Sequence, residues 1–301
     1  MDRARAAVVV VSDALVDVVE DCGGMRTEYP GGAGLNLAIG VRRLGVPAWL
    51  AAPLADDENG RWLRAVLDGE GVQLIPLHTE LSTGVAVSTR VGGEPSYEFS
   101  KSVYQRRFRY SATDVELMGQ GNVIVVNSFP LGDLDQVADL VDMMQETGSA
   151  IVVDPNVRPS LIGEGSDYRE GFLRVASVAD LVKLSLQDVE SLFESAAKDV
   201  VANLLTMGVG AVVLTEAEQG ASVFTVDGGR VRVPVPARPD PVVDTMGAGD
   251  ATLAQLLCGI ARHGLLRTSE EWRDLLSQAM EVAANTCRIK GAILEVRQET
   301  K

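Results

Sequence analysis

Apolar and polar positions follow two alternating patterns along this chain. Short, continuous apolar runs rich in β-branched residues stand at 8–11, 123–126, 151–154, 181–184 and 212–215. Longer stretches with apolar residues at helical spacing, each ending at a glycine where a helix would stop, stand at 35–45, 59–69, 134–148 and 270–291. Continuous apolar strands that alternate with amphipathic helices are typical of a parallel sheet covered on both faces. The pattern therefore predicts a doubly wound α/β fold with a mostly parallel sheet.

Two regions, 15–32 and 83–101, interrupt this rhythm, because they contain strand-like alternation without an intervening helix. In the second region Gly92-Gly93 joins two alternating segments as a hairpin turn would. We expect these regions to form a small β-sheet lid, built from about 15–32 and 83–103 and inserted in a single domain that spans 1–301. A further hairpin is predicted at 221–235, with its turn at Gly228-Gly229.

The charge and the cysteine content narrow the class of protein. A formal net charge of -15 argues against binding to nucleic acid or anionic lipid, which needs clustered Lys and Arg. The three cysteines, Cys22, Cys258 and Cys287, are too few and too scattered for a disulfide framework or a zinc site. The apolar run near the N-terminus is too short for a signal peptide, and no stretch is long enough to span a bilayer. We expect a cytoplasmic protein with no nucleic-acid or membrane partner.

The segment 244–250, DTMGAGD, is the strongest candidate for chemistry. It follows a proline-rich approach that cannot be helical, so the next helix is expected to begin at its glycines. Glycines there let backbone N–H groups approach an anion, and the helix dipole adds positive potential. Asp250 is either a simple N-cap or, with Asp244 across the turn, part of a site. At a helix N-terminus its pKa should be lowered, and phosphoryl transfer tolerates such a weak base.

Other glycine motifs do not fit the chain. No GxxxxGK[ST] sequence is present, which excludes a P-loop protein. The segment 31–40 has Leu37 where a dinucleotide-binding fingerprint needs glycine, and it follows a Tyr-Pro loop instead of a strand. The sequence 106–110, RRFRY, is the one basic aromatic run, and in an acidic chain we interpret it as a loop or a flank of the ligand site. His78 and His263 match no metal or catalytic spacing and are expected to be structural or surface residues.

Over essentially its whole length the chain resembles the ribokinase-like carbohydrate kinases of the phosphofructokinase B type, whose C-terminal signature corresponds to DTMGAGDA. The resemblance implies an enzyme that uses ATP and Mg²⁺, with a monovalent cation such as K⁺ near the catalytic loop. It assigns catalysis to Asp250, which would orient a hydroxymethyl group, and to the backbone of Gly247, Ala248 and Gly249. Because uncovered sheet faces and edges are liabilities, we also expect a homodimer formed through the lid.

The other matching segments supply the remaining expected site residues. Substrate-binding positions implied by the resemblance are Asp13, Asp17, Gly31, Gly32, Asn36, Asn156 and Arg158. Nucleotide-binding positions implied in the same way are Lys183, Ser185, Thr215, Gly220 and Gly249. For metals, the resemblance points to Asp188 for Mg²⁺, through a water, and to Asp244, Met246 and the turn at 288–291 for the monovalent cation.

Three positions depart from the family pattern. Asp188 stands where glutamate is more common, and the segment 93–95 reads Gly-Glu-Pro in place of Gly-Glu-Arg. Ala217 replaces a glycine in the turn against the nucleotide. If that turn needs a positive φ, alanine costs about 1 kcal/mol or more; if it does not, only the close approach to the nucleotide changes.

We expect phosphorylation of fructose or a related keto-sugar such as 2-keto-3-deoxygluconate, a preference that rests on the resemblance of the segments 154–161 and 183–193. A nucleoside kinase of the same fold is an alternative, with Tyr97, Phe99 and Tyr104 as a wall for the base. A non-catalytic sugar-binding regulator is a second alternative, suggested by Ala217.

Overall fold

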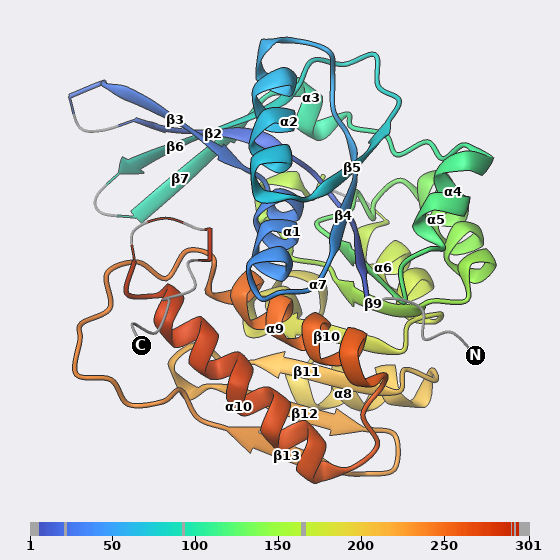
Figure 1. The fold of residues 1–301 in the computed structure, drawn as a ribbon. Coiled ribbons are helices and arrows are strands. Elements are labelled where there is room, and N and C mark those ends of the chain that lie inside the picture. The colour runs from blue at the N-terminus through green and yellow to red at the C-terminus, as the bar shows by residue number, and fades with distance from the viewer. Residues whose placement is uncertain are drawn as a thin grey trace.

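A large sheet between two layers of helices forms the body of the protein, and a small separate sheet projects from it (Figure 1). The computed structural model describes residues 6–20, 23–91, 94–163, 167–289, 291, 293 and 294. Cys22 and the turn at Gly92-Gly93 lie outside these residues. The predicted doubly wound α/β fold with a small β lid is confirmed.

The large sheet has nine strands in the order β13-β12-β11-β10-β9-β8-β1-β4-β5. Its strands are β1 (Val8–Val11), β4 (Ala48–Pro53), β5 (Gln73–Leu77), β8 (Val123–Asn127), β9 (Ala150–Asp154), β10 (Leu181–Ser185), β11 (Ala211–Thr215), β12 (Ala221–Thr225) and β13 (Arg230–Val233). All neighbours are parallel except β11, β12 and β13, which pair antiparallel at one edge. The predicted hairpin at 221–235 is therefore confirmed, and it extends the main sheet.

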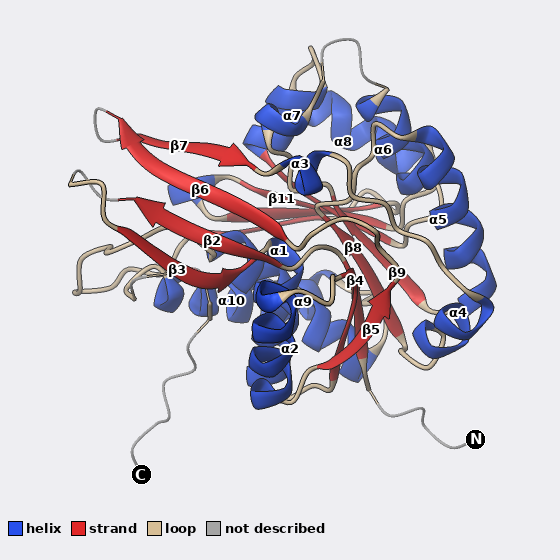
Figure 2. Ribbon diagram, turned by 90° about the horizontal axis from the view of Figure 1, so that it is seen from above, coloured by secondary structure: helices blue, strands red, loops and turns tan. Residues whose placement is uncertain are grey.

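Alternation along each apolar strand divides the core into two layers. Val8 and Val10 of β1 face one core, whereas Val9 and Val11 face the other, and all four are fully buried. The first core is covered by α1 (Ala33–Arg43), α2 (Glu58–Glu70), α9 (Ala248–His263) and α10 (Ser269–Thr286). The second is covered by α4 (Ala112–Met118), α5 (Leu134–Thr147), α6 (Tyr168–Ala176), α7 (Leu186–Leu192) and α8 (Ala197–Thr206). Figure 2 shows these two sets of helices on opposite sides of the sheet.

The projecting sheet has four strands in the order β3-β2-β6-β7. They are β2 (Leu15–Glu20), β3 (Arg26–Gly31), β6 (Gly84–Val91) and β7 (Glu94–Phe99), so both predicted lid regions contribute two strands. At its base Leu15 and Ala86 pack against Val103 of the short helix α3 (Lys101–Tyr104). The lid thus joins the body where the chain leaves β1 and where it returns through α3. A single domain spanning the chain stays a prediction.

Glycines end two of the predicted helices. Gly71 and Gly148 have φ of 69° and 66° and cap α2 and α5 in the left-handed conformation. The expected end of α2 at Gly69 is wrong, because the helix continues through this residue to Glu70. The expected end of α10 at Gly291 is also wrong: Thr286 is its last residue. There the Cys287 carbonyl accepts hydrogen bonds from the Val243 and Asp244 N–H groups, which ties the helix end to the start of the DTMGAGD segment.

The order of the strands reverses between β1 and β8. From β1 the chain proceeds to β4 and β5 on one side, and later from β8 to β11 on the other. In open α/β sheets ligands bind outside the carboxyl ends of the strands at such a switch point. Two short 3₁₀ turns, Pro159–Leu161 and Ala217–Gln219, also follow carboxyl ends, after β9 and β11. No helix in the described part of the chain is both long and apolar enough to cross a membrane.

Candidate active site

A chain of buried polar side chains crosses the carboxyl ends of four strands. The Ser12 hydroxyl, after β1, donates to Asn127 Oδ1 of β8 at 3.4 Å, and Asn127 Nδ2 donates to Asp154 Oδ2 of β9 at 3.3 Å. Lys183 of β10 donates from Nζ to the same Asp154 oxygen at 2.9 Å. Sequence reasoning missed Ser12, Asn127 and Asp154, although each is the first polar residue at the end of an apolar run.

Lys183 brings a positive charge into this buried network. Burial alone would lower its pKa, but the carboxylates of Asp154, Asp188 and Asp250 outweigh burial and raise the pKa above its usual range. The side chain is therefore an ammonium. A Cβ on Gly249 would lie 3.6 Å from its Nζ, so the charge lies beside the start of α9.

The helix α9 begins at the glycines of the DTMGAGD segment, as predicted. Gly247 is its N-cap, with a φ of 78° that favours glycine, and Asp250 is its third residue. Ala248 donates its N–H to the Thr245 carbonyl at 3.3 Å. Within the described residues no acceptor faces the N–H groups of Gly247, Gly249 or Asp250. Free amides, the helix dipole and Lys183 together make a site for an anion.

Of the two interpretations of Asp250, the simple N-cap is wrong, and the expected lowering of its pKa is wrong as well. It is not the N-cap, and burial raises the pKa of its carboxyl to about 6. Lys183 and Arg158 oppose this rise, whereas the carboxylates of Asp154 and Asp13 reinforce it. The predicted lowering at a helix N-terminus is wrong because desolvation and neighbouring carboxylates outweigh the dipole. A carboxylate with a pKa near 6 is a stronger base than an ordinary aspartate and is still ionised at neutral pH.

Two buried oxygen acceptors near this anion site have no partner in the described part of the chain. They are Asp13 Oδ1, after β1, and Asn36 Oδ1, in the first turn of α1. Gly32 precedes α1 with a φ of 97°, and a Cβ there would lie 3.1 Å from Asp13 Oδ1. A buried acceptor without a donor is unfavourable, so a ligand that brings hydroxyl donors would stabilise the site.

The lid adds Asp17 to this group of side chains. Burial raises the pKa of Asp17 to about 6, reinforced by the Asp13 carboxylate and opposed by the Gly32 N–H and by Arg158. A Cβ on Gly31 would come within 1.9 Å of Asp17 Oδ2, so any side chain at this position would displace the carboxylate. The structure thus brings the predicted residues of β1, the lid and α1 together.

The loops after β8 and β9 are held in an uncommon conformation. Ser128 and Asn156 have positive φ values of 51° and 41°, a region that non-glycine residues seldom occupy. The Asp154 carboxylate accepts the Asn156 N–H at 3.1 Å, and Asn156 Oδ1 accepts from Arg158 Nη1 at 2.8 Å. Arg158 itself is exposed, and its charge acts on Asp17 and Asp250. Backbone strain of this kind clusters at functional sites.

Asp188, the predicted magnesium ligand, already accepts three hydrogen bonds within the protein. Its Oδ2 accepts the N–H and the hydroxyl of Ser185, at 2.7 and 2.6 Å, in the capping box of α7. Its Oδ1 accepts the Val157 N–H at 2.7 Å. The carboxylate therefore fastens the loop after β9 to the start of α7. Any contact with a cation would use the remaining lone pairs, which suits a bridging water.

The turn after β11 contains the other predicted nucleotide residues. Thr215, the last residue of β11, donates its hydroxyl to the Leu184 carbonyl at 3.3 Å. Gly220 has a φ of 94°, and a Cβ there would lie 2.1 Å from the Val233 carbonyl oxygen, so packing of the hairpin alone requires glycine. Ala217 has a φ of 49°, which shows that the turn does use the left-handed region.

Two distant segments meet beside the DTMGAGD turn, as predicted for the monovalent cation. Asp244 Oδ1 accepts the Met246 N–H at 3.0 Å, and Oδ2 accepts the Gly291 N–H at 3.3 Å. No group of three or more His, Cys, Asp or Glu side chains in the described residues is arranged to hold a metal ion. Occupancy by a cation stays a prediction.

Comparisons with known proteins identify the family of the chain. The family model described as pfkB family carbohydrate kinase matches residues 5–299. The chain is 30% identical to a fructokinase of Klebsiella pneumoniae, over 94% of each protein. It is similar to aminoimidazole riboside kinase of Salmonella enterica, solved with aminoimidazole riboside and an ATP analogue (TM-score 0.77, 26% identity, 95% of each chain). It has the fold of a fructokinase double mutant of Vibrio cholerae O395, solved with fructose, ADP and potassium ion (TM-score 0.80, 22% identity, 97% and 96% of the chains). The chain therefore belongs to the pfkB family of carbohydrate kinases, which are ATP-dependent enzymes.

Proposed function

We propose that this protein transfers the γ-phosphoryl group of ATP to a hydroxymethyl group of fructose or a closely related keto-sugar. One observation carries the proposal: the Asp250 carboxylate lies at the free amides of α9, within the electrostatic reach of Lys183 and of the unpaired acceptor Asp13. A base, an anion site and acceptors for hydroxyl groups are the three parts that sugar phosphorylation needs. The resemblance to a fructokinase over nearly the whole chain supports fructose as the acceptor.

In the proposed mechanism Asp13, Asp17 and Asn36 accept hydrogen bonds from sugar hydroxyls, and the lid excludes water that would otherwise accept the phosphoryl group. Asp250 orients the acceptor hydroxyl and takes its proton as the oxygen attacks the γ-phosphorus, and the bond from that phosphorus to the β,γ-bridging oxygen breaks to release ADP. The N–H groups of Gly247 and Gly249 stabilise the charge on the moving phosphoryl group, aided by the Lys183 ammonium.

The residues present also fit the two metal ions that we propose. Bound Mg²⁺ would neutralise charge on the phosphate oxygens, and Asp188 would reach it through a water. The carbonyl oxygens around Asp244 and Met246 suit a monovalent cation, and the fructokinase of Vibrio cholerae was solved with a potassium ion. We keep Ser185, Thr215 and Gly220 as the proposed nucleotide-side residues.

A nucleoside is the second candidate acceptor, because an aromatic pair stands at the base of the lid. Phe99 and Tyr104 meet edge to face, with ring centroids 6.2 Å apart, and Tyr104 is half exposed. The similarity to aminoimidazole riboside kinase supports this candidate. The structure does not describe the side chain of Tyr97.

The lid also exposes the apolar side chains of Val19 and Tyr29, which supports a homodimer formed through the lid.

ADP release with ATP and Mg²⁺ across fructose, 2-keto-3-deoxygluconate, ribose and adenosine would test the assignment. We expect fructose or the keto-acid to give a kcat/KM about tenfold above the others, because one hydrogen bond contributes about 1 kcal/mol net. Adenosine as the best acceptor would favour the nucleoside candidate. Binding of sugar without turnover of any acceptor would favour the regulator.

The Ala217→Gly variant should be more stable than the natural chain by about 1 kcal/mol, because a left-handed φ strains alanine but not glycine. Urea unfolding would measure the change. Glu218→Gly in the same exposed turn is the matched control, since Glu218 has no positive φ and glycine there should destabilise. Equal shifts in both variants would show that the φ of Ala217 is not the source of strain. A lower KM for ATP in Ala217→Gly alone would link the turn to the nucleotide.

A further inference from the structure

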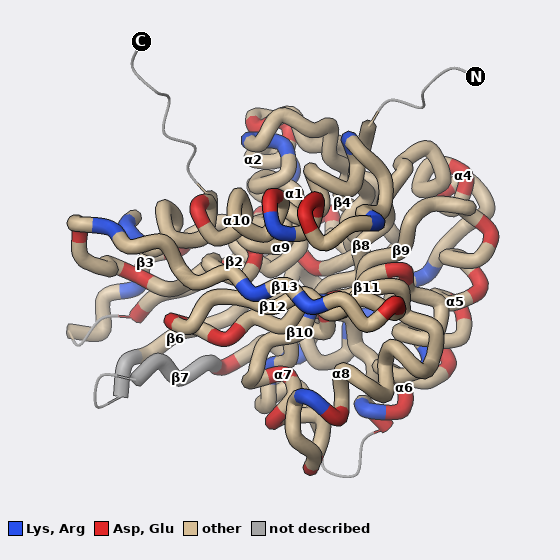
Figure 3. The backbone as a smooth tube through the Cα atoms, turned by 90° about the horizontal axis from the view of Figure 1, so that it is seen from below, with Lys and Arg blue, Asp and Glu red and all other residues tan. Residues whose placement is uncertain are grey.

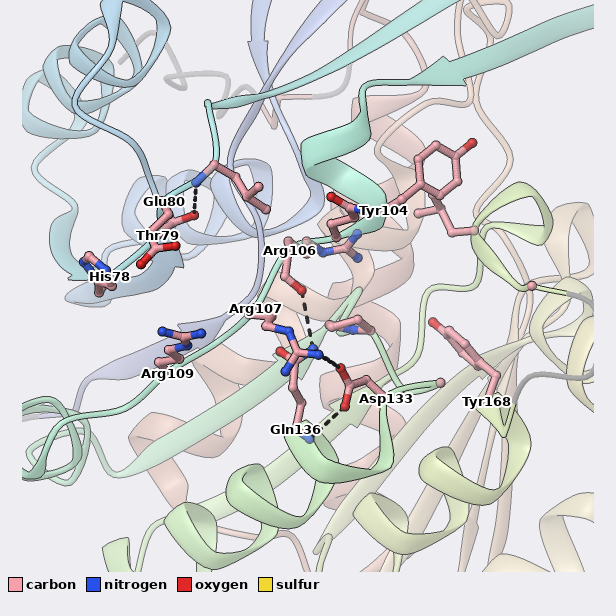
Figure 4. Close-up of a pocket in the computed structure, with 16 residues that line it drawn as sticks. His78, Thr79, Glu80, Tyr104, Arg106, Arg107, Arg109, Asp133, Gln136 and Tyr168 are labelled. Atoms are coloured by element: carbon pink, nitrogen blue, oxygen red, sulfur yellow. Dashed lines mark hydrogen bonds and ion pairs between the residues drawn. The ribbon is translucent and has the colours of Figure 1, made fainter.

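A second pocket, of about 600 Å³, lies beside the proposed sugar cleft. Its wall combines the end of β5, the segment after α3, the start of α5 and the approach to α6, and Figure 4 shows the labelled side chains. Arg106, Arg107 and Arg109 lie along one segment there, with His78 on one side and Tyr168 on the other. The volume suits a small metabolite.

One of the three arginines is neutralised within the protein. Arg107 pairs with Asp133 at 3.1 Å. Asp133 is also the N-cap of α5, where it accepts the N–H of Gln136 at 3.2 Å and its side-chain Nε2 at 2.9 Å. This carboxylate is fixed by three donors and cannot turn to the other arginines.

The remaining two arginines have no carboxylate partner in the described residues. Arg106 donates to the carbonyls of Val103 and Ser128, at 2.5 and 2.7 Å, and its buried Nε has no acceptor. Arg109 is exposed, and no acceptor or ion pair is found for it in the described part of the chain. Among the described residues that line the pocket, Glu80 is the other acid, so the three arginines outnumber the acids there.

This local excess contrasts with the rest of the molecule. The chain has a formal net charge of -15, and Figure 3 shows acidic residues on the lid and in both helical layers. Arginine presents planar, paired donors that match phosphate oxygens. A cluster of such donors in a concave pocket within an acidic chain selects a small anion, whereas a nucleic acid needs an extended basic surface.

We propose that this pocket binds the phosphate group of a small ligand, with Arg109 and Arg106 as its donors. Arg106 also lines a small cavity that includes Asp13, so the phosphate would lie next to the sugar cleft. The phosphate belongs either to the acceptor sugar or to a separate ligand that acts on the kinase from this side. Phosphate binding at this site does not depend on the proposed fructose phosphorylation, but a phosphate carried by the acceptor would make a sugar phosphate the acceptor in place of fructose.

Calorimetric titration of the full-length protein with inorganic phosphate tests the site without any turnover. We expect Arg109→Gln to weaken phosphate binding at least about tenfold, as loss of a charged hydrogen bond does. Arg169→Gln is the matched control, because Arg169 is an exposed arginine of α6 that does not line the pocket. Equal affinities in the natural chain, Arg109→Gln and Arg169→Gln, or no binding to the natural chain, would overturn the proposal.

Fructose 6-phosphate distinguishes the two sources of the phosphate. If it is phosphorylated with a KM that rises in Arg109→Gln, the pocket holds the acceptor's own phosphate. If it is not phosphorylated but changes fructose turnover in an Arg109-dependent way, the pocket holds a separate ligand. A sugar phosphate that neither turns over nor displaces inorganic phosphate from the natural chain would contradict the proposed site.

Discussion

Asp250→Asn should lower kcat by about 10³-fold with every acceptor, within the range that general-base groups contribute. Asparagine keeps the shape of the side chain and its place in the first turn of α9, but it cannot accept the hydroxyl proton. The change is measured as ADP release at saturating sugar, ATP and Mg²⁺. Turnover equal to that of the natural chain would refute the role of Asp250 and with it the proposed mechanism.

A stability measurement separates this loss from misfolding. The pKa of Asp250 is raised in the folded protein, from 3.8 to about 6, so its carboxylate is destabilising once it ionises. Its contribution to stability is therefore present at low pH and is lost as the pH rises from about 4 to 6. Asparagine does not ionise, so Asp250→Asn avoids this loss of stability. We expect the variant to unfold at a higher urea concentration than the natural chain at pH 7.5.

The pKa of Asp250 should also determine how kcat/KM falls at acidic pH. Since Asp250 must be ionised to act as a base, kcat/KM should fall about tenfold per pH unit below about 6. If sugar binding also needs Asp17 ionised, whose pKa is likewise about 6, this fall should steepen towards about a hundredfold per pH unit, and Asp250→Asn should return it to about tenfold. The same slope in the natural chain and in Asp250→Asn would show that only one of the two ionisations limits kcat/KM.

The sequence carried enough local information to predict many of the elements, although β4 and β5 of the main sheet were not placed. β-Branched runs, helical spacing and paired glycines placed five strands of the main sheet, its edge hairpin and the lid, because each signal depends on residues close together in the chain. The ends of α2 and α10 were missed, since Gly69 is tolerated inside one helix and contacts of Cys287 with Val243 and Asp244 terminate the other.

The buried network could not be predicted in the same way. Ser12 and Asn127 are 115 residues apart, and they meet because β8 lies beside β1. Strand order is a property of the whole sheet, so the motif at the end of each strand did not reveal its partner. The error in the pKa of Asp250 has the same origin: its helix was predicted, but not the acids and the burial contributed by other elements.

A residue that matches the family pattern does not always need a ligand contact to explain it. Gly220 matches the family pattern, yet the 2.1 Å approach of a Cβ to the Val233 carbonyl explains the glycine without a ligand. Asp188 likewise joins two loops through three hydrogen bonds. These residues hold the strand ends in place, so a ligand contact would be an addition to a structural role. Lys183 and Asp154 form the part of the site where stability and chemistry are most closely coupled.

Lys183→Met should therefore lower both the stability of the protein and its activity. The side chains of Lys183 and Asp154 are almost inaccessible, at 5% and 0% exposed, and their ion pair spans 2.9 Å. Removing one member leaves a buried, unpaired charge, so we expect a loss of about 3–5 kcal/mol in the free energy of unfolding. We also expect kcat to fall about 10²-fold or more, because the ammonium beside Gly249 is lost from the anion site. Urea unfolding and ADP release measure the two effects separately.

The pH dependence and a second variant separate charge from packing. Burial already raises the pKa of Asp154, and without the ammonium that pKa should rise further. The Asp154 carboxyl is then neutral in acid, so the stability lost in Lys183→Met should shrink as the pH falls and grow as it rises. Adding Asp154→Asn removes the stranded charge and should restore much of the stability at pH 7.5, but not the activity. Recovery of turnover in this double variant would show that Lys183 serves only to neutralise Asp154, and that the amides of α9 hold the phosphoryl group without it.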